Sequence, residues 1–296
     1  MSQDSNNLNA QRRQWLASAL VGAGQLIYSA NALAATQTNA TSQTASKTWR
    51  LAVVPQLTAV EMTRNWTPIV SALAQAGLNM ELVIYPSISK FEPEFLKGHA
   101  DFVFLNPYHM VMAKRTQRYE PLLRDARPLE GLLVVKADGP VQAIEQLKDH
   151  RLSFPAPNAF AASLYIRSML ERKHHLAFDA HYAGTHRNAI RQVLAGDSAA
   201  AGVVRTTLEQ EPPEVRQAVR VIYTTPPLSP HPLAAHPRVP ASVRQQVSQV
   251  LLALADKPET TALMGAIQMP SPQAAIYAKD YAPLEQLKIE KFVVVE

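Results

Sequence analysis

Short apolar segments alternate with helical segments early in the chain, and this alternation constrains the fold more than any other feature. The segments WRLAVVP (49–55), MELVIYP (80–86) and ADFVFLNP (100–107) are apolar runs that end in Pro, as short buried strands do. Residues 60–77 and 108–118 have the spacing of helices. A strand–helix–strand–helix order predicts an α/β fold with a mostly parallel sheet covered by helices.

A second set of alternating segments follows from residue 131. Its expected elements are strands at 131–138, 151–155, 199–204 and 219–227, a strand or loop near 178–184, and helices at about 160–173, 187–195 and 207–218. From Pro240 onward, helices dominate at about 241–255 and 258–266. The chain therefore predicts two α/β units of similar size with a helical C-terminal part.

The N-terminal region is typical of an exported protein. The pair Arg12-Arg13 precedes a modest apolar run and a small-x-small sequence at 32–34. The apolar run is too short and too interrupted by Gly for a convincing membrane span. We expect residues 1–34 to be a signal peptide that is cleaved after Ala34. The arginine pair resembles a twin-arginine signal, and the Sec route stays open as an alternative.

Composition excludes several classes of protein. The chain is 47% hydrophobic and 18% charged, which favours a globular body, whereas the polar residues 35–48 predict a flexible leader. The net charge is +5, but the basic residues are dispersed, so we expect no nucleic-acid partner. There is no cysteine, which excludes disulfides and thiolate chemistry. No HExxH, GxSxG or phosphate-cradling Gly loop is present, so we expect neither an enzyme nor a cofactor.

Four motifs follow one another in an order that resembles a known family. They are LAVVPQ (51–56), ADFVFLNPY (100–108), LSFPAPNAFAAS (152–163) and GTHRNAIRQVLAGDSAAAGVV (184–204). This order resembles the phosphate/phosphite/phosphonate substrate-binding proteins of bacterial ABC transporters, which have the type II periplasmic binding protein fold. The resemblance runs from about residue 50 to the end of the sequence.

The resemblance implies two lobes with a ligand cleft between them. Lobe one is expected to comprise residues 49–130 and 238–296, and lobe two residues 131–237, with two hinge crossings near 130–131 and 226–237. Ligand binding would close the hinge, and a transporter would recognise the closed form. The resemblance also implies a periplasmic protein, which we expect to be a monomer, that passes a small anionic ligand to an ABC transporter permease.

The segment at 158–161 is expected to contact the ligand at the start of a helix. In phosphonate-binding members this turn is rich in Ser and Thr, whose hydroxyls help to hold the anion. Here the residues are Asn158, Ala159, Phe160 and Ala161. The backbone amides at a helix start still favour an anion, although the hydroxyl donors have been lost. Phe160 is interpreted either as a contact to an apolar part of the ligand or as a core residue.

Further cleft residues are implied by the same resemblance. His186 is favoured as a ligand contact. Asn106 is interpreted equally as a ligand contact or as a structural turn residue, so Tyr108 is the preferred candidate of the two. Arg205 would attract a carboxylate or oxyanion, unless it is a solvated surface residue. The remaining candidates are Gln56, Thr58, Tyr85, His109, Thr206 and Thr225, and His231 lies in the expected return crossing.

These observations favour a periplasmic solute-binding protein that captures a small anion for uptake by an ABC transporter. The anion would be a phosphorus or other oxyanion, or a carboxylate with an apolar part. Two alternatives stay open. One is a ligand-sensing adaptor for a sensor kinase. The other is a transition-metal site formed by His109, His186 and His231, if their imidazoles converge.

Overall fold

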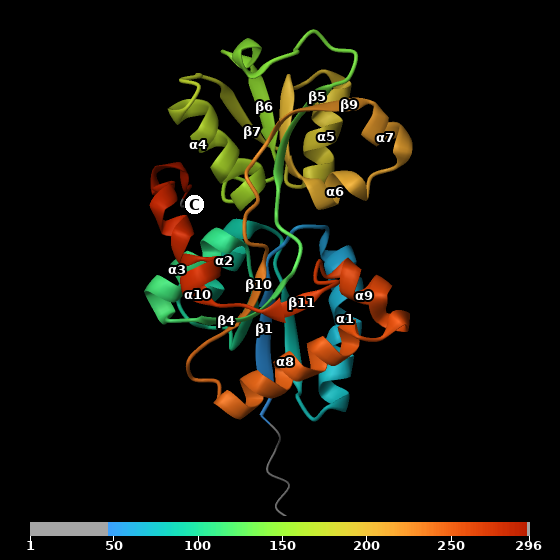
Figure 1. Cartoon of the computed structure of the whole chain (residues 1–296), viewed down its shortest axis with the longest axis vertical. Coiled ribbons are helices and arrows are strands. Elements are labelled where there is room, and N and C mark those ends of the chain that lie inside the picture. The colour runs from blue at the N-terminus through green and yellow to red at the C-terminus, as the bar shows by residue number, and fades with distance from the viewer. Residues whose placement is uncertain (1–46, 295–296) are drawn as a thin grey trace, which may run out of the picture. The chain divides into compact units, whose positions relative to one another are not determined.

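The computed structural model describes residues 47–294. The expected signal peptide, its cleavage site and nearly all of the expected leader lie outside the described residues. The described part contains two β-sheets, each with its own helices, and we call these the first and second lobes (Figure 1). Within residues 47–294, no helix is both long and apolar enough to cross a membrane.

The first sheet is mixed. Its strands are β1 (Trp49–Val53), β2 (Met80–Ile84), β3 (Phe102–Phe104), β4 (Glu120–Asp125), β10 (Pro232–Ala235) and β11 (Pro272–Ala274), in the order β11-β4-β10-β3-β1-β2. β1 pairs in parallel with β2 and β3, as the sequence predicts. β10 pairs antiparallel with β3 and β4, and β11 pairs antiparallel with β4. The expectation of a mostly parallel sheet therefore holds for only half of this sheet.

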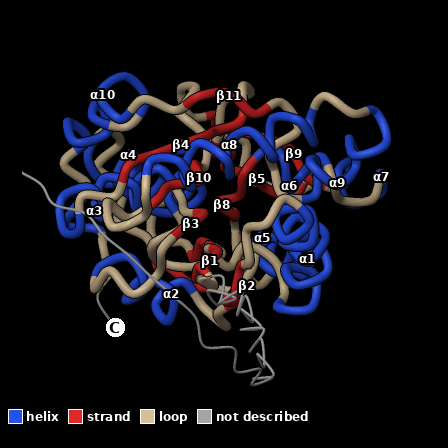
Figure 2. The backbone as a smooth tube through the Cα atoms, turned by 90° about the horizontal axis from the view of Figure 1, so that it is seen from below, coloured by secondary structure: helices blue, strands red, loops and turns tan. Residues whose placement is uncertain are grey.

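Helices cover both faces of the first sheet. They are α1 (Ala59–Gln75), α2 (Ile88–Leu96), α3 (Pro107–Gln117), α8 (Ala241–Ala255), α9 (Thr261–Ala266) and α10 (Tyr277–Asp280), with 3₁₀ turns at Pro258–Thr260, Ala282–Leu287 and Glu290–Phe292. Seen from below, α2 and α3 lie on one side of the strands and α1 on the other (Figure 2). The helix starts that point to the second lobe are capped by side chains, Thr58 at α1 and Asn106 at α3.

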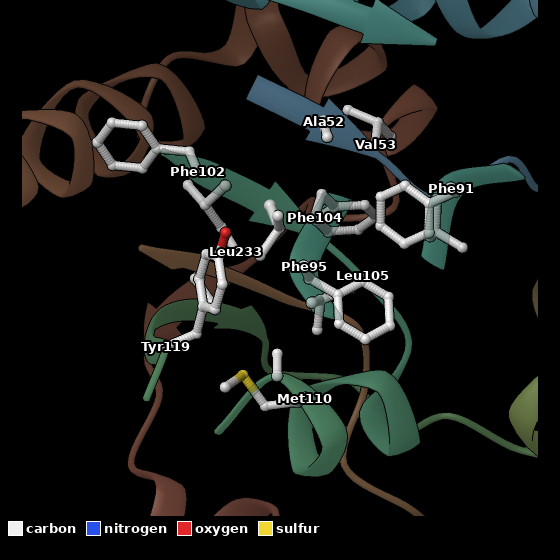
Figure 3. Packing of buried hydrophobic residues seen from close by; sticks show 14 of the residues in the cluster. Ala52, Val53, Phe91, Phe95, Phe102, Phe104, Leu105, Met110, Tyr119 and Leu233 are labelled. Carbon is white, nitrogen blue, oxygen red and sulfur yellow. The ribbon is translucent and has the colours of Figure 1, made fainter. Parts of the chain in front are cut away.

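Aromatic side chains build the core of the first lobe. Phe102 and Phe104 from β3 are about 1% exposed, and they project from a strand of three buried residues. Phe91 and Phe95 from α2 are fully buried with ring centroids 5.5 Å apart, and Met110 from α3 belongs to the same core (Figure 3). Burial of each such side chain contributes roughly 1.5–3 kcal/mol to folding. This packing fixes α2 and α3, whose ends carry cleft residues.

The second sheet has five strands and is also mixed. They are β5 (Gly131–Lys136), β6 (Arg151–Phe154), β7 (Asp179–Tyr182), β8 (Ala200–Val204) and β9 (Val219–Thr224), in the order β7-β6-β8-β5-β9. β6 is parallel to β7 and β8, whereas β5 is antiparallel to β8 and β9. The segment near 178–184, expected as a strand or a loop, contains the strand β7.

The second lobe contains four helices and two short helical turns. They are the 3₁₀ turn Ile144–Leu147, the π-helical turn η2 (Phe160–Leu164), α4 (Tyr165–Arg172), α5 (His186–Ala195), α6 (Arg205–Glu209) and α7 (Pro213–Gln217). The prediction of a single helix at 207–218 is wrong. Pro212 and Pro213 lack the backbone N–H that a continuous helix needs, so the chain breaks into α6 and α7.

Two chain segments connect the lobes, and they contact each other. The outgoing segment precedes β5, and the returning segment runs from Thr225 to His231. Leu129 and Leu228 exchange two backbone hydrogen bonds of 2.8 and 3.0 Å between these segments. β10 already belongs to the first sheet, so the return to the first lobe comes earlier than the boundary expected at residue 238.

The C-terminal segment, residues 285–294, also bonds to both lobes. Glu290 pairs with Arg115 of α3 at 3.3 Å. On the second lobe, Arg167 of α4 donates to the Phe292 carbonyl at 2.7 Å, and Lys291 pairs with Glu171 at 2.6 Å. The C-terminal segment therefore links the two lobes.

Candidate functional site

A small, partly enclosed cavity lies between the two lobes, and we call it the inner cavity. Its volume is about 30 Å³, which leaves room for a small ion or one or two water molecules. The first lobe and the crossings contribute Val54, Pro55, Gln56, Ile88, Asn106, Leu129 and His231, and the second lobe contributes Pro155, Ala156, Ala159, Phe160, Ala161, Gly184, His186 and Val204.

The start of the helix that contains η2 and α4 forms one wall of the inner cavity. Ala159 is the N-cap residue and offers no side-chain hydrogen bond to the helix. Ser163 and Leu164 both donate their N–H groups to the Ala159 carbonyl, which produces the π-helical turn. The N–H groups of the preceding first turn, which includes Phe160 and Ala161, have no intrahelical acceptor. The positive end of the helix dipole therefore lies at the cavity.

Two glycines allow this helix start to lie directly on the sheet. A Cβ atom at Gly131 would lie 2.2 Å from the Ala161 carbonyl oxygen, and one at Gly202 would lie 2.0 Å from the Ala162 oxygen. Both distances are too short for any side chain, so these positions require glycine for close backbone approach. The strands β5 and β8 thus determine where the uncapped N–H groups lie.

Two buried histidines line the inner cavity, one from each side. Burial lowers the pKa of His186 to about 4. Burial, together with repulsion from His109 and His186, lowers the pKa of His231 to about 3. Nε2 of His231 lies 2.6 Å from the Gln56 amide nitrogen. Nδ1 of His186 is buried and has no hydrogen-bond partner among the described residues. Both rings are neutral at neutral pH, and each can donate one N–H.

The inner cavity has no formally charged wall within the described part of the chain. Its lining residues include no Asp, Glu, Lys or Arg. These walls therefore contain no carboxylate that would repel a bound anion. They also contain no cation that would neutralise its charge. Recognition of an anion in this cavity must rest on oriented N–H dipoles, which lose little solvation when the anion arrives because they are already buried.

Asn158 connects the lobes next to the helix start. Its backbone carbonyl accepts a 3.0 Å hydrogen bond from the side chain of Asn106, and its amide nitrogen lies 2.7 Å from Oε1 of Glu92. The same amide group exchanges hydrogen bonds with the backbone of Val294, at 2.8 and 3.0 Å. One buried side chain of the second lobe thus bonds to α2 and to the C-terminal segment.

A second, larger cavity adjoins the inner one, and we call it the outer cavity. Its volume is about 310 Å³. It lies beside the inner cavity, with which it shares five lining residues: Pro55, Ile88, Pro155, Ala156 and Gly184. The candidates Thr58, Tyr85 and Asn158 line this outer cavity.

The predicted site residues fall into three groups. Gln56, Asn106, Ala159, Phe160, Ala161 and His186 line the inner cavity, while Thr58, Tyr85 and Asn158 line the outer cavity. Tyr108, His109, Arg205, Thr206 and Thr225 line neither of these two cavities. Five residues line both cavities and were not predicted, because small and apolar residues carry no chemical signal in a sequence: Pro55, Ile88, Pro155, Ala156 and Gly184.

Arg205 does not enter the cleft as expected. Its guanidinium forms an ion pair with Glu130 on the outgoing crossing, and the whole side chain is 41% exposed. The hypothesis that Arg205 attracts the ligand directly is therefore not supported by its position. Thr225 has a structural contact as well, since its hydroxyl accepts a 2.9 Å hydrogen bond from the Gly131 N–H.

Tyr108 contacts the second lobe, whereas His109 is turned into the first lobe. The Tyr108 ring stacks on Phe160 with centroids 6.4 Å apart, so Phe160 serves both as a core residue and as a cavity wall. His109 is fully buried, and its Nε2 lies 3.2 Å from Oε1 of Glu92. Among residues 47–294, no group of three or more His, Cys, Asp or Glu side chains is arranged to hold a metal ion. The metal alternative therefore gains no support.

A comparison with protein families decides the class of this protein. Residues 51–281 match the model of a family described as "ABC transporter, phosphonate, periplasmic substrate-binding protein". The chain belongs to this family. The phosphonate-binding-protein family comprises transport proteins, which confirms the fold and the functional class expected from the sequence. A search of curated proteins finds no match.

Solved structures of similar proteins share the fold of this phosphonate-binding-family member. A binding protein component of an ABC phosphonate transporter from Pseudomonas aeruginosa has a TM-score of 0.72 at 14% identity, over 82% of this chain and 86% of that one. PhnD1 from Prochlorococcus marinus, in complex with methylphosphonate, has a TM-score of 0.72 at 14% identity, over 82% and 97%. A Xanthomonas citri protein bound to ATP has a TM-score of 0.63 at 14% identity, over 83% and 96%.

We expect the protein to lose stability in acid because of His186 and His231. Their pKa values in the folded protein are about 4 and about 3, below the value of 6.5 for an unfolded histidine. The unfolded chain therefore takes up protons first as the pH falls. Above pH 6.5 the two neutral rings contribute fully to the free energy of unfolding. This contribution, on the order of several kcal/mol, is lost as the pH falls from 6.5 to about 3.

Urea unfolding at a series of pH values between 7 and 4 measures this loss. The double variant His186→Gln, His231→Gln should show a shallower decline than the wild type, because an amide does not titrate in this range. An equally steep decline in both proteins would contradict the assignment.

Proposed function

We propose that the protein captures a tetrahedral oxyanion of the phosphonate type in the inner cavity and delivers it to the permease of an ABC transporter. One observation carries the proposal: the helix start at Ala159 has no side-chain cap, and its first residues line the inner cavity, which has no carboxylate among its described lining residues. Buried N–H groups at a helix start form a binding site for anions. The family description supports the same chemical class.

In this proposal, backbone groups replace the hydroxyls that the turn has lost. The N–H groups of Phe160 and Ala161 donate to the oxygens of the anion, and His186 donates from the opposite part of the wall. Gln56 and His231 form a hydrogen-bonded pair that completes the donor set. Each hydrogen bond to a charged group contributes roughly 1.5–3 kcal/mol.

The binding event is coupled to lobe closure. The inner cavity has walls from both lobes, so a ligand held there stabilises the closed arrangement of the cleft. The expected export route fits this function, with a twin-arginine-like signal peptide cleaved after Ala34 and a monomer released into the periplasm.

Titration calorimetry with the full chain tests the proposal. The panel comprises methylphosphonate, phosphite, phosphate, methanesulfonate and acetate. We expect methylphosphonate to bind, and we expect His186→Ala to weaken that binding by about 10- to 100-fold, because one hydrogen bond to the anion is lost.

Arg205→Ala is the matched control, since it removes a cation that lies outside both cavities and should leave the dissociation constant unchanged. Binding of acetate alone, binding of none of the five anions, or an equal effect of both substitutions would overturn the proposal.

A further inference from the structure

The outer cavity adjoins the inner cavity and is about ten times larger, at about 310 Å³ against about 30 Å³. Five residues line both cavities, so the two spaces are immediate neighbours. An oxyanion in the inner cavity would therefore direct its substituent into the outer cavity. The chemistry of the outer walls then selects the substituent.

The outer walls combine apolar groups with hydroxyls. Their side chains are Leu57, Ala59, Ile88, Val294, Tyr85, Tyr182, Thr58, Ser87, Ser89, Thr185 and Asn158, together with several prolines, Ala156 and Gly184. None of the described residues that line this cavity is charged. Transfer of a charged group from water to such walls is unfavourable, whereas apolar and hydroxylated groups find suitable partners.

Two tyrosines line the outer cavity from opposite lobes, and each is held in place by an arginine. The Tyr85 hydroxyl accepts a 3.1 Å hydrogen bond from Arg50. The guanidinium of Arg167 lies over the Tyr182 ring at 5.6 Å from its centroid. Aromatic rings can attract a cationic ligand, but the Tyr182 ring already has a guanidinium over it. An ammonium group on the ligand would meet that positive charge.

Carboxylates that contact the lining residues are already engaged: Glu94 pairs with Arg50 at 3.0 Å, and Glu92 accepts a 2.7 Å hydrogen bond from Asn158. Glu61 lines the neighbouring space beside Thr58, not the outer cavity itself. Its Oε2 accepts hydrogen bonds from the Thr58 N–H and hydroxyl at 3.1 and 2.7 Å, and its Oε1 pairs with Arg187 at 3.4 Å. This carboxylate is therefore not available to pair with a substituent's ammonium group.

From these contacts we infer that the protein selects phosphonates with an uncharged organic substituent, such as an alkyl, aryl or hydroxyalkyl group, held between Tyr85 and Tyr182, and discriminates against aminoalkyl phosphonates. The inference rests on the proposed function, because it requires the oxyanion to occupy the inner cavity. It adds the class of substituent, which that proposal leaves open.

Calorimetry with matched ligands on the full chain tests the inference. Ethylphosphonate and 2-aminoethylphosphonate differ by one ammonium group, and phenylphosphonate adds an aromatic ring. We expect ethylphosphonate to bind at least tenfold more tightly than its amino analogue. We expect Tyr182→Ala to weaken phenylphosphonate binding at least tenfold and to leave methylphosphonate binding within about threefold of the wild type. Tyr182→Phe should retain phenylphosphonate binding.

A second variant protects the test against misfolding at position 182. Ser89→Trp, at a wall of the outer cavity only, should fill the space and weaken phenylphosphonate binding without weakening methylphosphonate binding. Tighter binding of 2-aminoethylphosphonate than of ethylphosphonate would overturn the inference while the proposed function stands. So would an equal loss of affinity for methylphosphonate and phenylphosphonate in both Tyr182→Ala and Ser89→Trp. Failure of every phosphonate, methylphosphonate included, would overturn the proposed function itself.

Discussion

Gly202→Ala is expected to lower the free energy of unfolding by about 3 kcal/mol, at the upper end of the range for overpacked cores. The added Cβ would lie 2.0 Å from the Ala162 carbonyl oxygen and 2.7 Å from the ring of Phe154. Neither neighbour can move easily, because Ala162 belongs to the π-helical turn and Phe154 is fully buried. Urea unfolding at neutral pH measures the change.

Gly265→Ala is the matched control for this substitution. It lies in α9, and an added Cβ would meet nothing within 4 Å. Alanine is favoured over glycine in a helix by about 1 kcal/mol, so the control should be neutral or slightly stabilising. If both alanines have the same effect on unfolding, the close contact between β8 and the helix start is not what requires glycine.

Asn158→Ala is expected to loosen both the fold and the closed cleft. The substitution removes the hydrogen bond to Glu92 and the two hydrogen bonds to Val294. Glu92 is only 8% exposed, so its carboxylate loses a partner that water cannot readily replace. We expect the free energy of unfolding to fall by about 3 kcal/mol and the affinity for methylphosphonate to fall about tenfold, because the closed state is less populated.

Asn65→Ala provides a comparison within the first lobe. Its amide makes a single 3.3 Å hydrogen bond to the Ala266 carbonyl, and its loss should cost at most about 1 kcal/mol. Small-angle X-ray scattering without ligand should show a larger radius of gyration for Asn158→Ala than for Asn65→Ala. Identical scattering, stability and affinity for the two variants would exclude a role of Asn158 in closure.

The fold could be predicted where apolar runs were uninterrupted, and it could not where charges or prolines broke the pattern. β4 was missed because EPLLRD alternates buried residues with Glu120, Leu122 and Arg124, and its charged ends hide a short strand. β10 was interpreted as part of the return crossing because it follows a Pro-rich stretch, yet its Leu233 and two alanines are buried in the first sheet.

The site could be predicted only as far as backbone position determines it. The motif order placed Gln56, the helix start and His186 at one cavity, since strand ends and helix starts fix those positions. Side-chain direction could not be predicted. Arg205 turns to Glu130, and His109 turns to Glu92, because these partners lie far away in the sequence. The contact between Asn158 and Val294 has the same origin.

The C-terminal segment offers a place to record ligand capture optically. Lys291 is half exposed and pairs with Glu171 of the second lobe, while neighbouring Glu290 pairs with α3 of the first. The chain has no cysteine, so Lys291→Cys would create a single site for thiol-specific labelling. An environment-sensitive dye there would sit where the two lobes meet, outside both cavities, and its emission would report opening and closing without occupying the space that the ligand needs.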